Sequence, residues 1–400
     1  MASSGLNDYV NEVCKALDYR EGIKASELLS FSHSHIANAR LRVEAPEAIC
    51  SRILAQPFDE MVAAHIKTIW SSSKGNHDEA WQYQNITVQA FIKGFQAMKE
   101  ENWALPLMQT LILDLRNFAR RGDKRAIGGK PGERQEKAAE TIMSAFRACT
   151  SDTRTRLDDS KRWGMLFVVN QLFKTYFAVG KLHLLKPLIR AIDACDIRDE
   201  FSLSQRVTYQ YYVGRKALLD SNFSLADEYL SFAYRNCHPS SFRNRKLILV
   251  NLIAVKMLMG QVPKQELLLQ NGLREYRAVV HAMKTGNIGL MDDALAKHEY
   301  FFVRSGIYLI IEKLKLVVIR QLFKKVMKMA GHHQIQLQIF LDAINFAGMP
   351  ECDMEELECL MAGLISHNLI RGYISHQYKK VVFSRKEPFP VIKKSPLTFL

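Results

Sequence analysis

Apolar residues recur at three- and four-residue steps along almost the whole chain, a period typical of amphipathic α-helices. Residues 165–177 show it clearly, with Leu166, Val169 and Leu172 on one side of the expected helix. Similar segments follow at 182–194, 204–220, 224–237 and 243–259, with short connectors between them. Helix pairs that repeat every ~34–45 residues bury a core only by stacking on one another. The period therefore predicts an all-α solenoid of tetratricopeptide- or HEAT-like helical repeats.

One predicted hairpin has small residues where two helices would cross closely. Gly214 is followed by Ala226 and then by Ala233, at offsets that match the small positions of a tetratricopeptide repeat. Phe223 lies at the expected turn as an apolar plug. This match supports the architecture and carries no information about a ligand.

The pattern changes toward the C-terminus. Helices are predicted at 313–329, at 338–347 and, after the N-cap residue Asp353, to about residue 367. A short extended segment is expected at 334–337, and two alternating strands at 369–375 and 380–384. This order predicts a winged helix. Its expected core residues are Leu316, Ile319, Phe323, Phe340, Leu341, Ile344, Leu357, Leu360, Leu364, Ile365 and Ile370.

These segments predict four regions: N-terminal helical repeats at 1–150, further repeats at 151–312, the winged helix at 313–390 and a tail at 391–400. Glycine and charge are concentrated at 120–134, which indicates an exposed loop between helices.

The charge is uneven along the chain. The formal net charge is +14, and residues 241–400 contain 23 Lys and Arg against 13 Asp and Glu. Such a local excess attracts phosphate backbones or acidic protein partners. A generally basic surface without a specific partner is the alternative.

A basic stripe is expected on the first helix of the winged module, whose cations fall within about 80° of one another. Further cations surround the predicted hairpin. The proposed nucleic-acid-binding residues are Lys313, Arg320, Lys324, Lys328, Arg371, Tyr378, Lys379, Lys380, Arg385 and Lys386. A solvated helix face is the alternative for the stripe, and a disordered acidic peptide would compete for the same cations.

The third helix of the module is acidic at its start, which argues against reading the major groove with that helix. Its carboxylates are Glu351, Asp353, Glu355, Glu356 and Glu358. The remaining route is sequence-tolerant contact with phosphate through the wing and the first helix. Tyr378 is the expected stacking residue for unpaired bases, since alternation places at least one of Tyr373 and Phe383 in the core.

Motifs of known enzyme classes are missing from the sequence: there is no GxxxxGK[ST], GxGxxG, HExxH or GxSxG. Seven scattered cysteines without a CxxC pair indicate reduced, intracellular thiols. The histidine pairs at 33/35 and 332/333 lack further ligands at metal-like spacing. We therefore expect no catalytic residue, no metal, no cofactor, no small-molecule substrate and no membrane insertion.

The chain resembles the PCI-domain-containing protein 2 family over nearly its whole length. Segments that carry the resemblance include DSKRWGMLFVVNQLFKTYF (159–177), QRVTYQYYVGRKALLDSNF (205–223) and RGYISHQYKKVVFSRKEPFP (371–390). The resemblance implies a PCI domain, in which a helical solenoid continues into a winged helix. It also implies a non-enzymatic scaffold role in nuclear messenger RNA export.

The same resemblance implies particular partners and a location. The implied partners are a Sac-domain scaffold protein, a small acidic disordered subunit, nuclear pore components, and RNA or single-stranded DNA. The implied location is the nucleus, including the nuclear pore and envelope, with some protein in the cytoplasm. The alternative is a structural PCI subunit of a proteasome-lid or signalosome-like assembly that does not bind nucleic acid.

Overall fold

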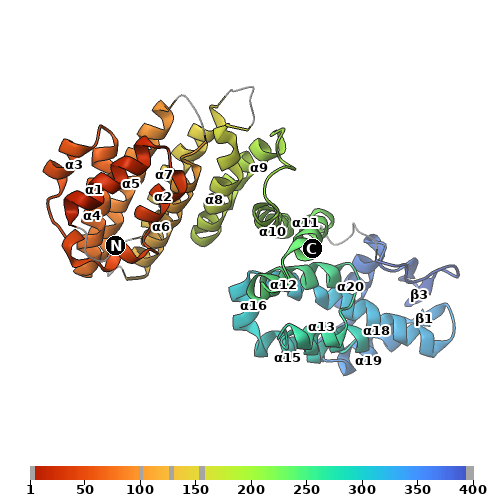
Figure 1. The fold of residues 1–400 in the computed structure, drawn as a ribbon. Helices are drawn as coiled ribbons and strands as arrows, with labels where there is room; N and C mark the ends of the chain where they lie inside the picture. Colours follow the sequence, from red (N-terminus) through yellow and green to blue (C-terminus); the bar gives the residue numbers. More distant parts are fainter. Residues whose placement is uncertain (1–4, 99–101, 126–129, 153–157, 393–400) are drawn as a thin grey trace. The chain divides into compact units, whose positions relative to one another are not determined.

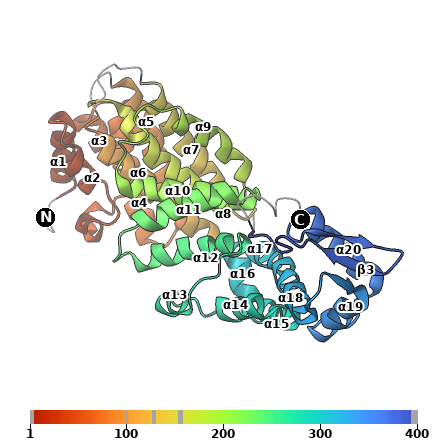
Figure 2. The same cartoon turned by 90° about the vertical axis from the view of Figure 1, so that its right-hand side faces the viewer.

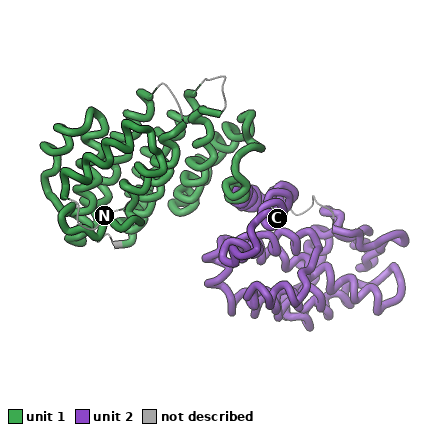
Figure 3. The backbone as a smooth tube through the Cα atoms, viewed as in Figure 1, with its two compact units in different colours: residues 1–209 green, residues 210–400 purple. Residues whose placement is uncertain are grey.

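The computed structural model describes residues 5–98, 102–125, 130–152 and 158–392 (Figure 1). Helices dominate, and one small sheet lies near the C-terminus. The chain forms two compact units, residues 1–209 and residues 210–400, which divide inside helix α10 (Figure 3). The predicted boundary at residue 150 does not coincide with this division, because α7 packs against the η3 and α8 segments that follow it.

Unit 1 is a stack of helices in which α4, α5, α6, α7 and α8 each pack against the next. Its elements are α1 (Leu6–Asp18), α2 (Gly22–Leu28), η1 (Ser34–Ala37), η2 (Ala39–Leu41), α3 (Glu47–Ile53), α4 (Phe58–Ser73), α5 (His77–Ala97), α6 (Leu105–Arg125), α7 (Glu133–Thr150), η3 (Lys161–Gly164), α8 (Met165–Val179), η4 (Leu182–Leu184) and α9 (Leu185–Asp193). Helix α10 (Leu203–Leu219) links the two units.

Unit 2 contains further helical hairpins and then the winged helix. Its elements are α11 (Phe223–Asn236), α12 (Phe242–Leu258), α13 (Gln265–Gln270), α14 (Tyr276–Thr285), α15 (Ile288–Lys297), α16 (Glu299–Ser305), α17 (Tyr308–Glu312), α18 (Leu314–Ala330), β1 (Gln334–Gln336), α19 (Leu337–Phe346), α20 (Met354–Ser366), β2 (Gly372–Ser375) and β3 (Lys380–Phe383). Helices α18 to α20 and the strands lie together (Figure 2). The predicted fold class, a helical solenoid with a C-terminal winged helix, is confirmed.

The hairpin between α10 and α11 depends on its small residues. A side chain at Gly214 would approach the Leu230 side chain to 2.8 Å, and Ala226 and Ala233 are fully buried. Phe223 is buried at the turn, as predicted. Close helix crossing therefore explains why this hairpin contains Gly and Ala at these positions.

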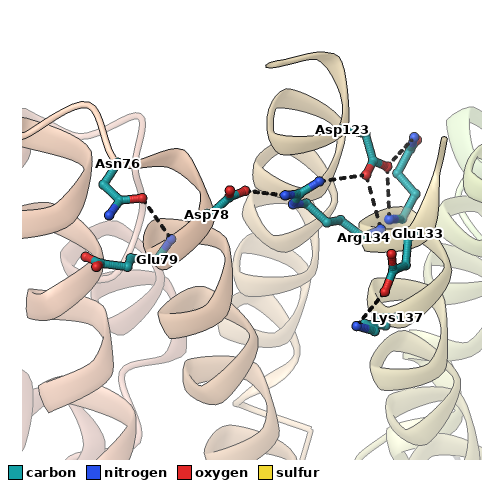
Figure 4. A network of polar contacts seen from close by, with 8 residues as sticks. Asn76, Asp78, Glu79, Asp123, Glu133, Arg134 and Lys137 are labelled. Atoms are coloured by element: carbon teal, nitrogen blue, oxygen red, sulfur yellow. Dashed lines mark hydrogen bonds and ion pairs between the residues drawn. The ribbon is translucent and has the colours of Figure 1, made fainter. Parts of the chain in front are cut away.

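The segment at 120–134 is not one loop. Helix α6 continues to residue 125 because Asp123 accepts backbone hydrogen bonds from Arg134 and Gln135 at the start of α7. The Arg134 guanidinium lies 3.7 Å from Asp123 and 2.5 Å from Asp78 (Figure 4). These ion pairs connect α5, α6 and α7. The prediction of an exposed loop over the whole segment is therefore wrong, and residues 126–129 lie outside the described part of the chain.

A buried histidine pair lies in the core of unit 1. His35 and His65 are both buried, and their Nε2 atoms are 3.3 Å apart. Burial, followed by the neighbouring His33, lowers the pKa of His35 to about 4. Burial also lowers the pKa of His65 well below its ordinary value. The pair is therefore neutral at pH 7.

The solenoid and the winged helix meet where α15 begins and α19 ends. The backbone N–H groups of Ile288 and Gly289 both donate to the carbonyl of Ala347, at 2.9 and 2.8 Å. Gly348 has a φ of +118°, and a Cβ there would overlap the Gly289 backbone. Only glycine fits this contact without displacing one of the two helices.

Candidate nucleic-acid interface

The sheet of the winged helix has one covered face and one open face. The strand order is β1-β3-β2, and both pairings are antiparallel. Ile335, Val381 and Phe383 face inward and are buried. The opposite face, which we call the wing face, contains Gln334, Gln336, Tyr373, Ser375, Lys380 and Val382. None of these six side chains is buried.

The aromatic residues of the hairpin divide between core and surface. The Phe383 ring stacks on Phe389 at 5.6 Å and lies 5.9 Å from Phe340. Tyr373, on the wing face, is 61% exposed, and Tyr378 is 68% exposed in the turn. The alternating pattern left open which of Tyr373 and Phe383 lies in the core, and the structure shows that it is Phe383. The structure adds Tyr373 as a second exposed aromatic side chain that the sequence did not single out.

Arg320 does not belong to an exposed stripe, and the prediction that it does is wrong. The side chain is only 7% exposed. Its Nε donates to the carbonyl of Leu369 at 2.9 Å, and its second amine donates to the carbonyl of Pro390 at 2.5 Å. Pro390 accepts this hydrogen bond, and the Phe389 ring centre lies 5.7 Å from the guanidinium. Arg320 therefore anchors the end of the chain and is not available to phosphate.

The other cations of α18 are less continuous than the helical projection suggested. Lys313 precedes the helix, and its Nζ lies 6.0 Å from the centre of the Phe223 ring. Lys324 is half-buried, and burial, with the charges of Arg320 and Lys328, lowers its pKa. Lys328 is exposed in the last turn. The burial of Arg320 interrupts the stripe between its first and last members.

The cations around the hairpin fall into two groups. Lys379 lies 3.1 Å from Glu358 of α20, and Arg371 lies 2.7 Å from Glu387. In contrast, no ion pair engages Lys380, Arg385 or Lys386 within the described residues. Arg385 and Lys386 are exposed directly after β3, and Lys380 lies on the wing face.

Glu358 connects the wing to the third helix of the module. The Glu358 carboxylate also accepts a hydrogen bond from Nδ1 of His376 at 2.9 Å. Burial alone would raise its pKa, but the hydrogen bonds and charges of Lys379 and His376 outweigh that effect and lower it. The exposed carboxylates of Glu355 and Glu356 lie in the first turn of α20, three and two residues before Glu358. A phosphate chain would therefore meet repulsion at this helix and attraction at the free cations of the hairpin.

Within the described ranges, none of the helices has the length and hydrophobicity that a bilayer span requires. The same ranges contain no group of three or more His, Cys, Asp or Glu side chains that could hold a metal ion. All seven cysteines are free.

Comparisons with known proteins agree with this architecture. A family model described as PCI domain matches residues 295–385, which include the winged helix. PCI domain-containing protein 2 of Xenopus laevis is 49% identical over 98% of both chains. Its Drosophila melanogaster homolog is 42% identical over 97% of this chain and 98% of the relative. A protein named CSN12 homolog, from Mycosarcoma maydis, is 29% identical over 86% of this chain and 87% of the relative.

Proposed function

Because this chain belongs to the PCI domain-containing protein 2 family and is a PCI-type scaffold subunit, we propose that it acts without enzymatic chemistry in nuclear messenger RNA export. In this role it binds RNA or single-stranded DNA through the winged helix. The contact is made mainly to phosphate, so it tolerates many sequences and weakens with salt.

One observation carries the nucleic-acid part of this proposal: cations without ion pairs lie beside exposed aromatic rings. Lys380 shares the wing face with Tyr373, and Arg385 and Lys386 follow the same strand. Tyr378 is exposed in the adjoining turn. Cations that hold phosphates next to rings that stack on bases are the usual elements of single-strand recognition. The acidic third helix makes reading of the major groove the poorer alternative.

The proposed protein partners are a Sac-domain scaffold protein and a small acidic disordered subunit, with nuclear pore components as further contacts. These proposals rest on the family resemblance. The proposed location is accordingly the nucleus, including the pore and envelope, with some protein in the cytoplasm.

A second candidate function is a structural PCI subunit of a lid- or signalosome-like assembly without nucleic-acid binding. It is favoured by the similarity to a protein named CSN12 homolog. The ion pairs of Arg371 and Lys379 also favour it, because these two expected phosphate contacts already have carboxylate partners within the module.

Affinity purification of the full-length chain with mass spectrometry separates the two candidates. Recovery of a Sac-domain protein, a small acidic protein and nucleoporins supports the first. Recovery of proteasome or signalosome subunits supports the second.

Nucleic-acid binding is tested with the purified complex and a single-stranded RNA in low salt. The variant Lys380→Glu/Arg385→Glu/Lys386→Glu leaves the Glu358 ion pairs intact. Its matched control, Arg52→Glu/Lys186→Glu/Arg190→Glu, reverses three exposed cations of unit 1. We expect weaker RNA binding only for the first variant. Equal affinity of the two variants would show that the hairpin cations are not the contact.

A further inference from the structure

A basic pocket lies in the solenoid part of unit 2, among residues of α13, α14 and the end of α15. Its volume is about 500 Å³, in the range of small-molecule sites. Its lining includes Leu268 and Val280, which are buried. The site is formed by residues other than those of the wing face.

The lining of this pocket has charges of one sign. Six of the lining residues are basic: Arg274, Arg277, His281, Lys284, Lys297 and His298. Arg277, His281 and Lys284 are spaced four and three residues apart on α14, so they share one side of that helix. Lys297 and His298 approach from the end of α15. No Asp or Glu is among the residues that line the pocket in the described chain.

The cations of this pocket have no carboxylate within ion-pair distance among the described residues. They are Arg274, Arg277, Lys284 and Lys297. A groove of about 750 Å³ between α11 and α12 provides the contrast. There Lys256 lies 2.8 Å from Asp227, so the groove neutralises its own charge. Like charges gathered without a counterion repel one another, and a bound anion would remove that repulsion.

We propose that this pocket binds a small, multiply phosphorylated anion. Two guanidinium groups supply the planar forks that match phosphate oxygens, and two ammonium groups supply further charge. The cations come from the turn before α14, from α14 and from the end of α15, and they line one pocket. This arrangement fits a compact ligand better than an extended peptide or a nucleic-acid strand, which needs a track of cations along its length. The ligand stabilises the folded unit because it binds only where the two helices are assembled.

Inorganic tripolyphosphate is a suitable probe, with sulfate at equal ionic strength as the reference anion. We expect tripolyphosphate, and not sulfate, to raise the Tm of the full-length protein and to give a saturable calorimetric isotherm. Arg277→Glu/Lys284→Glu should weaken the affinity at least ~10-fold, because each lost cation removes a charge-assisted contact. The milder Arg277→Gln/Lys284→Gln variant should weaken it less and confirms the assignment if the Glu variant folds poorly.

The matched control is Lys186→Glu/Arg190→Glu, which reverses two exposed cations of α9. It should bind tripolyphosphate as the wild type does. Equal affinity of the wild type and both pocket variants would overturn the proposal. So would a decaglutamate peptide or a single-stranded RNA that displaces tripolyphosphate and binds more tightly, since the pocket would then serve a larger partner.

Discussion

Replacing Arg320 by Ala tests whether this residue is a structural anchor or a phosphate contact. The substitution leaves the carbonyls of Leu369 and Pro390 without their donors in a buried position. Hydrogen bonds to charged groups contribute about 1.5–3 kcal/mol each, so the expected loss of stability from the two bonds is about 3–6 kcal/mol. Residues 388–392 should detach from α18, because the guanidinium connects them to it.

Hydrogen–deuterium exchange of the full-length protein measures this effect. In the Arg320→Ala variant, exchange in α18 and β2 should become at least ~100-fold faster, since every 1.4 kcal/mol is a factor of ten. Lys328→Ala, an exposed change in the same helix, should alter stability by less than about 0.5 kcal/mol. Unchanged exchange together with weaker RNA binding by Arg320→Ala would contradict an anchoring role. That result would restore the original interpretation of Arg320 as a phosphate contact.

The histidine pair and the contact between solenoid and winged helix can also be tested by pH and by substitution. As the pH falls from 6.5 to 5, His35 takes up a proton in the unfolded state but not in the folded state. This difference should lower the free energy of unfolding by about 2 kcal/mol. His65 adds to this loss, and Asp114, whose pKa burial raises to about 6, offsets about 1 kcal/mol. Exchange in α4, corrected for intrinsic rates, checks this, and equal protection at both pH values would contradict it. Gly348→Ala should destabilise unit 2 by about 2–4 kcal/mol because of the overlap and the positive φ. Gly363→Ala, where the added Cβ would meet no atom within 4 Å, is the control in urea unfolding, and similar losses in both variants would contradict this expectation.

Local signals in the sequence predicted most of the fold. The side chain of Asp353 accepts from the Glu356 backbone at 2.7 Å, so the predicted N-cap begins α20 as expected. Seven of the eleven predicted core residues of the winged helix are buried, and Leu316, Leu341, Leu360 and Ile365 are half-buried. Helical period, capping and alternation depend on neighbours a few residues away, and such neighbours are visible in a sequence.

The candidate site was less predictable because its electrostatics depend on distant segments. The Arg320 side chain donates a hydrogen bond to Pro390, which lies 70 positions later in the chain. Lys379 forms an ion pair with Glu358, which belongs to α20. A helical projection shows which residues share a side and not what covers that side. The apolar residues Phe389 and Ile392 after β3 were the available signal, because an apolar segment that follows the last strand must find a surface to cover.

In the proposed function, the cations beside β3 neutralise RNA phosphates. The most direct test of this role is the salt dependence of RNA binding by the complex that contains either Lys380→Glu/Arg385→Glu/Lys386→Glu or the wild-type chain. For a single strand, each phosphate contact contributes about −0.7 to the slope of log K against log salt concentration. We expect the slope of the variant to be less negative by about 2. Identical slopes would contradict this role, whatever the absolute affinities.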